Sequence, residues 1–88
     1  MVSEYQVEIE TSAAKQIQKM QRYDQRRIMD AIDALAVDPR PHGYTKLSGT
    51  TDAYRIRVGV FRIVYVINDG LLIVTVTRVA HRKEVYRK

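Results

Sequence analysis

Three runs of β-forming residues in the second half of the chain are separated by two short glycine turns, and this spacing restricts the fold more than any other feature. The runs cover residues 53–58, 61–68 and 71–80. Gly59-Val60 places glycine first in a two-residue turn, as a type II′ hairpin prefers, and Asp69-Gly70 is an even stronger hairpin signal. The chain therefore predicts a three-stranded antiparallel meander.

If both turns contain two residues, the pairing of all three strands follows. The first hairpin then pairs Val58 with Phe61, Arg57 with Arg62, Ile56 with Ile63 and Arg55 with Val64. The second pairs Ile67 with Leu72, Tyr65 with Val74, Ile63 with Val76 and Arg62 with Thr77.

Side chains alternate between the two faces of a sheet, so this register sorts the residues into two sets. One face gathers the apolar set: Tyr54, Ile56, Val58, Phe61, Ile63, Tyr65, Ile67, Leu72, Val74 and Val76. The other face gathers Arg55, Arg57, Arg62, Val64, Val66, Ile73, Thr75 and Thr77. A one-residue slip in either hairpin would put arginines into the core, so the register is strongly specified.

The first half of the chain supplies the elements that can cover the apolar face. Residues 5–10 alternate as a strand does, and Thr11 or Ser12 can cap a helix whose apolar stripe is Ala13, Ala14, Ile17 and Met20. A second helix should begin near Tyr23-Asp24, with the stripe Ile28, Ala31, Ile32, Leu35 and Ala36, and should end at the prolines of residues 38–43. Residues 39–52 read as a loop. We therefore predict a single α+β domain over residues 1–88, in which an antiparallel helix pair covers one face of a four-stranded sheet.

The positive charge is concentrated in the second half of the chain. The 88 residues carry a formal net charge of +5. Residues 1–38 contain five Lys/Arg and seven Asp/Glu, whereas residues 39–88 contain ten Lys/Arg and three Asp/Glu. Such asymmetry indicates a polyanion or an acidic partner, and a merely soluble basic surface is the less favoured alternative.

Composition also excludes several classes of protein. The chain has no cysteine, which rules out disulfides and thiolate chemistry. Residues 1–5 lack the regions of a signal peptide, and no apolar run approaches the roughly 20 residues that span a bilayer. We expect a cytoplasmic protein with no membrane partner.

The three arginines on the open face are the first candidates for a functional site. Arg57 and Arg62 would face each other directly, which lowers stability unless an anion binds between them. Arginine binds phosphate through its planar fork of donors. The alternative is that these arginines are solvated or paired with carboxylates, but we see no acidic residue within the strands on that face. An acidic peptide is a competing ligand.

Residues 80–88 add further candidates beside that face. Arg82 and Tyr86 would lie one helical turn apart on the same side, and tyrosine can stack on a base or donate a hydrogen bond to a phosphate. His81 is a candidate for proton transfer near neutral pH. A frayed basic tail with an exposed tyrosine is an equally good interpretation of the chemistry alone.

Several of these residues together resemble the RelE/ParE superfamily of toxin–antitoxin toxins. The resemblance is carried by residues 54–59 and 61–65, which hold the arginine hairpin, and by residues 79–82 and 85–86. It covers nearly the whole chain, and the order of one strand, two helices and three strands matches. The arginine hairpin marks the superfamily broadly, whereas the C-terminal His-Arg and Val-Tyr pairs mark the RNA-cleaving RelE branch.

This resemblance implies a ribosome-dependent endoribonuclease that cleaves mRNA in the A site of the small subunit. The ribose 2′-hydroxyl would attack the adjacent phosphate without a metal or other cofactor, which fits a chain that offers only His42 and His81 as imidazoles. Arg62 and Arg82 would stabilise the transition state, Arg55 and Arg57 would hold the phosphate, and Tyr86 would stack on the nucleotide. The predicted catalytic residues are Arg57, Arg62, His81, Arg82 and Tyr86, and the predicted substrate-binding residues are Arg55, Arg57 and Lys83.

The resemblance also implies partners: a RelB-like antitoxin that covers the basic face, and operator DNA bound through the toxin–antitoxin complex. One departure concerns the general base, because some relatives have lysine where this chain has Arg55 and Arg57, and arginine is a poor base. Either His81 takes that role, or catalysis is mainly positioning and charge stabilisation, which we favour slightly. His42, in a Pro-Gly loop, is interpreted as a surface residue.

Two other functions remain open. A ParE-like protein would inhibit DNA gyrase without nuclease activity and would not need Arg82 and Tyr86. An inactive or merely nucleic-acid-binding relative would use the arginines only to hold its partner.

Overall fold

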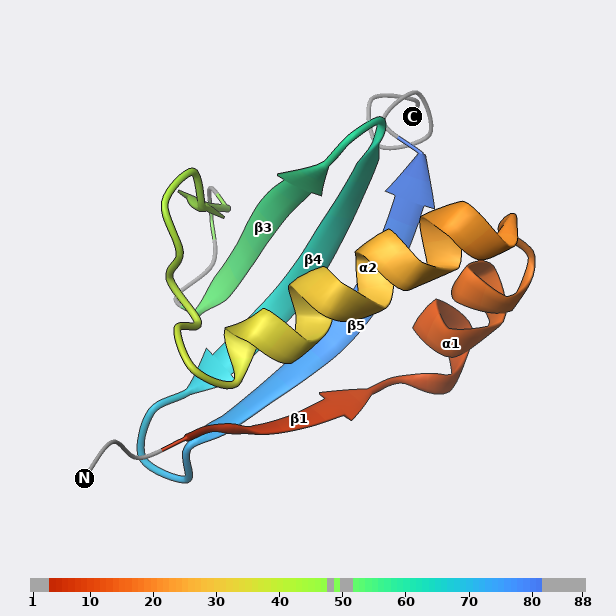
Figure 1. Cartoon of the computed structure of the whole chain (residues 1–88). Helices are drawn as coiled ribbons and strands as arrows, with labels where there is room; N and C mark the ends of the chain where they lie inside the picture. Colours follow the sequence, from red (N-terminus) through yellow and green to blue (C-terminus); the bar gives the residue numbers. More distant parts are fainter. Residues whose placement is uncertain (1–3, 48, 50–51, 82–88) are drawn as a thin grey trace.

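Two helices lie across one face of a mixed β-sheet (Figure 1). The computed structural model describes residues 4–47, 49 and 52–81. Within them the sheet has five strands in the order β1-β5-β4-β3-β2, and β1 runs parallel to β5 while the other neighbours are antiparallel. The elements are β1 (Gln6–Ile9), α1 (Thr11–Gln18), α2 (Arg22–Leu35), β2 (Thr45–Lys46), β3 (Ala53–Val58), β4 (Phe61–Asn68) and β5 (Ile73–His81).

The predicted α+β class and the order of the main elements are confirmed, with two local corrections. A short strand, β2, lies inside the segment 39–52 that was predicted to be a loop, so the described sheet has five strands rather than four. The N-cap of α1 is Glu10 rather than Thr11 or Ser12, which are already helical. Two residues of pairing, Thr45 with Arg55 and Lys46 with Tyr54, are too few to leave an alternation pattern in the sequence.

The register predicted for the first hairpin is confirmed in all four pairs, including Arg57 opposite Arg62. Gly59 has φ of 61°, the positive value that the first position of a type II′ turn requires. A side chain at this position would also meet the guanidinium of Arg27 from α2, because a Cβ on Gly59 would lie 2.9 Å from an Arg27 Nη atom. The positive φ of the turn therefore favours glycine here, while the Arg27 guanidinium, at the end of a flexible side chain, would have to move for any larger residue.

The register predicted for the second hairpin is wrong. Asn68 pairs with Ile73, so the connection contains four residues rather than two, and Tyr65 pairs with Val76 instead of Val74. The Leu71 backbone N–H donates to the Asn68 side-chain oxygen at 2.9 Å, and Leu72 adopts φ of 57°. The asparagine side chain thus closes the longer turn, a local hydrogen bond that competes with the two-residue geometry. A shift of two residues keeps each side chain on its predicted face.

A bulge in β5 then changes which residues of that strand face the helices. The pairing passes from Tyr65 with Val76 to Val64 with Arg78, which leaves Thr77 as the extra residue. Continued alternation from Val76 would have turned Arg78 toward the core, whereas after the bulge Val79 takes that side and is 1% exposed. The bulge therefore keeps a guanidinium out of the apolar layer.

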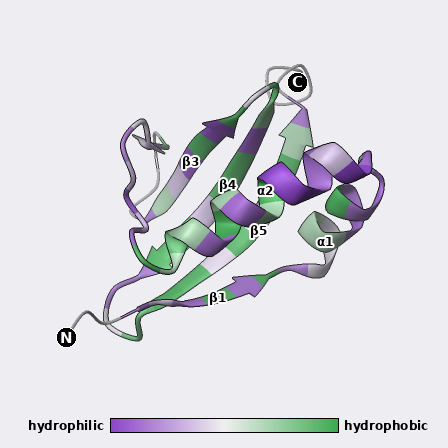
Figure 2. Cartoon of the chain, viewed as in Figure 1, coloured by the Kyte–Doolittle hydropathy of each residue, from purple (hydrophilic) through white to green (hydrophobic). Residues whose placement is uncertain are grey.

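The core lies between the sheet and the helices, on the face predicted to be apolar. The helices contribute buried side chains at helical spacing: Ala13, Ile17, Ile28, Ile32 and Leu35. The strands contribute Tyr54, Ile56, Ile63, Tyr65, Ile67, Val74, Val76 and Val79. In Figure 2 the strands that α2 crosses are largely hydrophobic, while α2 carries strongly hydrophilic residues. Within the described ranges, the helices fall short of the length and apolarity that crossing a membrane requires.

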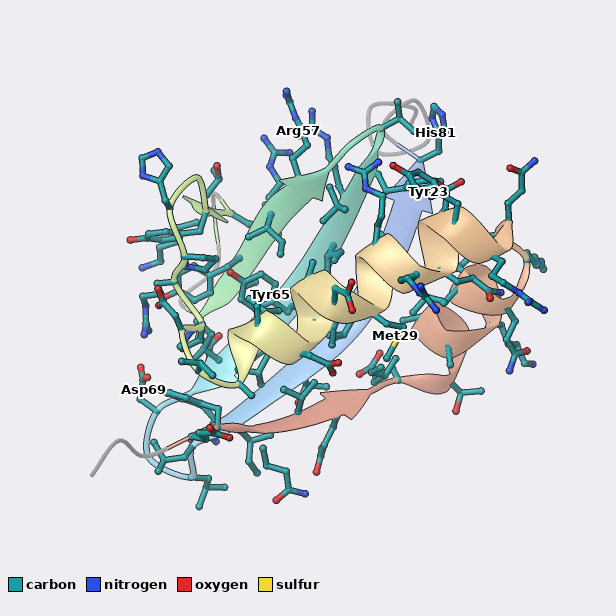
Figure 3. All side chains as sticks on the ribbon, in the orientation of Figure 1. Tyr23, Met29, Arg57, Tyr65, Asp69 and His81 are labelled. Carbon is teal, nitrogen blue, oxygen red and sulfur yellow. The ribbon has the colours of Figure 1, made fainter. Side chains whose placement is uncertain are left out.

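A polar clamp ties three distant segments together at the Asp69 end of the sheet (Figure 3). Arg40, which follows α2, donates to both carboxylate oxygens of Asp69 at 3.3 and 2.9 Å. The Tyr5 hydroxyl donates to the same carboxylate at 2.6 Å. The Arg40 guanidinium also lies 5.2 Å from the centre of the Tyr54 ring, a cation–π distance. Hydrogen bonds from Arg40 and Tyr5 lower the pKa of the Asp69 carboxyl below its ordinary value.

We predict that Asp69→Asn lowers the melting temperature at neutral pH and that this difference disappears in acid. A lowered folded-state pKa gives stability that is fully present above the unfolded-state pKa of about 3.9. That stability is lost as the pH falls through the lowered pKa. Thermal unfolding of both proteins between pH 7 and pH 2 measures it. If the difference in melting temperature between the two proteins stays constant down to pH 2, the carboxylate charge is not the cause of the stabilisation.

Candidate nucleic-acid interface

A cleft of about 520 Å³ opens at the outer edge of β3. β2 pairs with β3 only at Tyr54 and Arg55, so the part of β3 beyond Arg55 borders the cleft instead. The lining comes from α2, from the loop before β2, and from β3 and β4: Ala31, Ala34, Pro41, His42, Gly43, Thr45, Arg55, Ile56, Arg57, Val58 and Arg62. Its volume is within the range of about 300–1,000 Å³ that small-ligand sites occupy.

The three predicted arginines all line this cleft. Arg57 is exposed and Arg55 is half-buried, while Arg62 is only 4% exposed. Arg57 and Arg62 are directly opposite each other across the first hairpin. Figure 3 shows Arg57 at the turn end of β3, at the opposite end of the sheet from Asp69. The hairpin register thus brings three cations to one site, as the sequence predicted, but the cleft also includes Ala31 and Ala34 of α2 and so is not confined to the face that the helices leave open.

The expectation that no carboxylate lies in the strands on that face needs correction. Glu8 of β1 pairs with Thr75 and so lies on the same face as the arginines. It is exposed, and β5 separates its strand from β4. Thr75 in turn faces Val66, four residues along β4 from Arg62. Glu8 therefore occupies a different corner of the face and does not line the cleft.

His81 does not lie beside the arginine face as predicted, whereas His42 is an exposed loop residue as predicted. His81 faces Phe61, with ring centres 5.6 Å apart in an edge-to-face arrangement. The neighbouring pair, Arg62 with Ala80, belongs to the arginine side, so alternation puts His81 on the helix side of the sheet. His42, interpreted from sequence as an ordinary surface residue, lines the cleft with the arginines.

Three predicted site residues, Arg82, Lys83 and Tyr86, lie outside the described residues. Their predicted roles therefore stay predictions. For the part of the chain that the structure does describe, no group of three or more His, Cys, Asp and Glu side chains could hold a metal ion.

Sequence reasoning missed the wall of the cleft that faces the arginines. The sequence pattern places Ala31 on the apolar stripe of α2 and marks neither Ala34 nor the loop before β2 as part of a site. The two alanines leave room beside the strand because their side chains are small, and the pairing of Thr45 with Arg55 holds the loop against β3. The Pro41-His42-Gly43 segment, which lies two to four residues before Thr45, was the available signal.

The arrangement is suited to binding and stabilising a phosphodiester. Guanidinium groups donate forked, charge-assisted hydrogen bonds to phosphate oxygens. Burial of Arg62 strengthens its interaction with an anion, because charges attract more strongly where water is excluded. Arginines placed around a phosphorus can also stabilise the extra charge of a pentavalent transition state. They cannot accept a proton near neutral pH, so a base must come from another group.

Comparisons with known proteins match nearly the whole chain. The family model described as the ParE toxin of type II toxin–antitoxin systems matches residues 7–86. A protein named RelE1 from Methanocaldococcus jannaschii is 24% identical over 86 residues, which span 94% of this chain and 96% of that protein.

Two solved structures have the same fold at higher identity. A chain of the RelE–RelB complex from Pyrococcus horikoshii aligns with a TM-score of 0.80 and 29% identity, and the match covers 93% of this chain and 97% of that one. The isolated Escherichia coli RelE toxin aligns with a TM-score of 0.77 and 27% identity, over 93% of this chain and 90% of that one. Both similarities extend over nearly the whole length of each chain.

We predict that Arg57→Ala weakens binding to a short single-stranded RNA and makes it less dependent on salt. Each lost phosphate contact should reduce the steepness of log affinity against log salt concentration by about 0.7. Fluorescence anisotropy titrations at several salt concentrations measure this slope. Arg26→Ala is a matched control, because Arg26 is an exposed arginine of α2 outside the cleft lining. Equal slopes for the two variants would mean that net charge matters and the cleft does not.

Proposed function

Since the chain belongs to the ParE toxin family of type II toxin–antitoxin systems, within the RelE/ParE superfamily, we propose that it is a RelE-like toxin that cleaves mRNA in the ribosomal A site. The observation that carries this proposal is the cleft in which Arg55, Arg57 and Arg62 converge. The RelE proteins among its relatives support the ribonuclease interpretation.

The proposed reaction is an internal transesterification of RNA. The oxygen of a ribose 2′-hydroxyl bonds to the adjacent phosphorus, and the bond from that phosphorus to the 5′-oxygen of the next nucleotide breaks. The products carry a 2′,3′-cyclic phosphate and a 5′-hydroxyl. Because the nucleophile belongs to the RNA itself, this route needs no metal-activated water.

In this proposal the arginines have different roles. Arg55 and Arg57 hold the phosphate and its neighbouring backbone, and Arg62, the most buried of the three, stabilises the developing negative charge. Arg82 is proposed to assist Arg62, Tyr86 to stack on a nucleotide, and Lys83 to bind RNA, although these three residues lie outside the described part of the chain. His81 has no role in the proposed chemistry, because it lies on the helix side of the sheet.

The proposal includes partners. The solved structures that resemble this chain include RelE–RelB complexes, which supports a RelB-like antitoxin as the cognate partner. The substrate complex would be the small ribosomal subunit with mRNA in its A site, and the toxin–antitoxin complex would bind operator DNA. An acidic antitoxin segment is expected to cover the arginine cleft, since opposite charges across an interface favour association.

Gyrase inhibition is the second candidate, because the matching family model takes its name from ParE. The arginine hairpin marks the whole superfamily and does not separate these two candidates, whereas the RelE proteins among the relatives favour the ribonuclease. An inactive relative that uses the cleft only to hold its antitoxin is the third. The three candidates differ in what happens to mRNA when the protein is produced.

We predict that induced expression produces codon-phased cuts in translated messages, and that Arg62→Ala reduces cutting by about 100-fold or more. Removing one preorganised charge donor from a transition-state site typically has such an effect. Mapping of mRNA 5′ ends after induction measures it. Arg62→Lys keeps the charge but loses the planar fork and should be intermediate, while Arg26→Ala should cut normally.

Different outcomes distinguish the candidates. Growth arrest with intact messages and DNA-damage signalling would overturn the ribonuclease proposal in favour of gyrase. Antitoxin binding without growth arrest would favour an inactive relative. Circular dichroism of the purified variants separates loss of chemistry from loss of folding.

We also predict that the antitoxin protects the cleft arginines in the complex. Modification of Arg57 by phenylglyoxal, followed by mass spectrometry, should be fast in the free toxin and strongly slowed in the complex. Arg26 should react similarly in both states and serves as the internal reference. If Arg57 reacts equally fast in the complex, direct coverage is wrong, and displacement of the segment after β5 becomes the better explanation of neutralisation.

A further inference from the structure

One of the two histidines lies in the same cavity as the arginines. His42 belongs to the loop wall of the cleft, while Arg55, Arg57 and Arg62 belong to the strand wall. A phosphate held by the arginines would therefore lie in a cavity of about 520 Å³ that His42 also lines. His81 does not share this cavity, because it lies opposite Phe61 on the helix side of the sheet.

The loop that carries His42 is fixed on both sides of the histidine. Before it, buried Pro39 accepts a 2.8 Å hydrogen bond through its carbonyl from the hydroxyl of Tyr65, a fully buried core residue. After it, the backbone N–H of Tyr44 donates to the carbonyl of Pro41 at 3.0 Å.

The clamp described above adds a third attachment. Arg40 is bound to Asp69 through its guanidinium, and its backbone N–H donates to the Asp38 carboxylate at 3.1 Å. The loop is thus anchored to the core and to the β4–β5 turn. A group that transfers a proton must be held within about 0.5 Å of a productive position by its surroundings, and these contacts supply such support.

The arginine cleft needs a group of this kind. The 2′-hydroxyl must lose a proton as its oxygen bonds to phosphorus, and guanidinium groups do not accept one near neutral pH. A neutral imidazole does. His42, held by the anchored loop, can therefore supply the proton acceptor that the three arginines cannot.

We propose that His42 accepts the proton of the attacking 2′-hydroxyl, an inference that rests on the proposed ribonuclease function. The imidazole nitrogen takes the proton while the 2′-oxygen bonds to phosphorus and the bond to the 5′-oxygen breaks. The departing 5′-oxygen takes a proton from water, and the imidazolium returns its proton to the hydroxide that remains. Atoms and charge balance without an oxidant, reductant or metal ion.

A step in which His42 accepts a proton should depend on pH. Across the cleft it faces Arg55, Arg57 and Arg62, α2 contributes Ala31 and Ala34, and the loop itself carries Arg40, whose charge is paired with Asp69. The rate should rise with pH as the imidazole loses its proton and should then level off. Without the imidazole this rise should be absent.

The experiment is single-turnover cleavage of mRNA on programmed ribosomes between pH 5.5 and 8.5. His42→Ala should cut about 100-fold or more slowly, the usual range for a general base, and its rate should lose the wild-type pH dependence. Added imidazole should restore part of the rate of His42→Ala. His42→Gln, which keeps polarity and size better, should be equally slow, and His81→Ala provides the comparison with the other histidine.

Each outcome has a distinct meaning. If the wild type cuts and His42→Ala or His42→Gln cuts equally fast with the same pH profile, the His42 inference is overturned and the proposed function stands. If His81→Ala is the slow, imidazole-rescued variant, the proton acceptor is His81 and our inference is overturned. If the wild type does not cut at all, the proposed function fails and this inference fails with it. Melting temperatures show which variants fold, and exposed His42 is a position where substitution is usually tolerated.

Discussion

The alternation of side chains along β3 and β4 is the constraint on which both the core and the cleft depend. The Gly59 turn sets a pairing in which Arg57 meets Arg62 on one face while Ile56 meets Ile63 on the other. A shift of one residue would move guanidinium groups into the apolar layer and isoleucines into water. A single turn geometry therefore fixes the position of the buried core and of the cationic wall together, and the positive φ of Gly59 is what this turn requires.

The features that depend on local periodicity could be predicted from the sequence. The prediction was wrong where the strand register is set by a single side chain or by a contact between distant residues. The first hairpin follows from glycine position and alternation alone. The second does not, because the Asn68 side chain closes a four-residue turn that the Asp69-Gly70 signal conceals. The bulge at Thr77 likewise depends on tertiary packing and not on a local pattern. It buries Val79 and leaves Arg78 exposed to water. Neither difference disturbs the arginine face. The register of the second hairpin shifts by two residues, which keeps side chains on their faces, and the bulge returns an apolar residue to the helix side.

Only part of the candidate site could be predicted from the sequence. Its arginines were predictable because they sit in regular strands, whereas the opposite wall was not, because it depends on how the loop after α2 is held. That loop is placed by Tyr65, whose hydroxyl reaches Pro39 from inside the core, and by Asp69 from the far end of the sheet. Burial raises the pKa of the Tyr65 hydroxyl to about 12, so it remains a hydrogen-bond donor throughout the neutral range. These contacts join residues more than twenty positions apart, and no short pattern in the chain encodes them.

Two guanidinium groups in directly opposite strand positions disfavour the free protein and favour any anion that binds between them. Like charges across a strand pair lower stability, and with Arg62 almost fully buried solvent screens that interaction less than it would at the surface. An anion that occupies the cleft offsets the repulsion, so part of its binding free energy appears as stabilisation of the fold. Under the proposed function, a phosphodiester and an acidic antitoxin segment would satisfy the same charges and exclude each other. The toxin then needs no separate regulatory site, because the partner that stabilises it between rounds of activity is the one that keeps the substrate out.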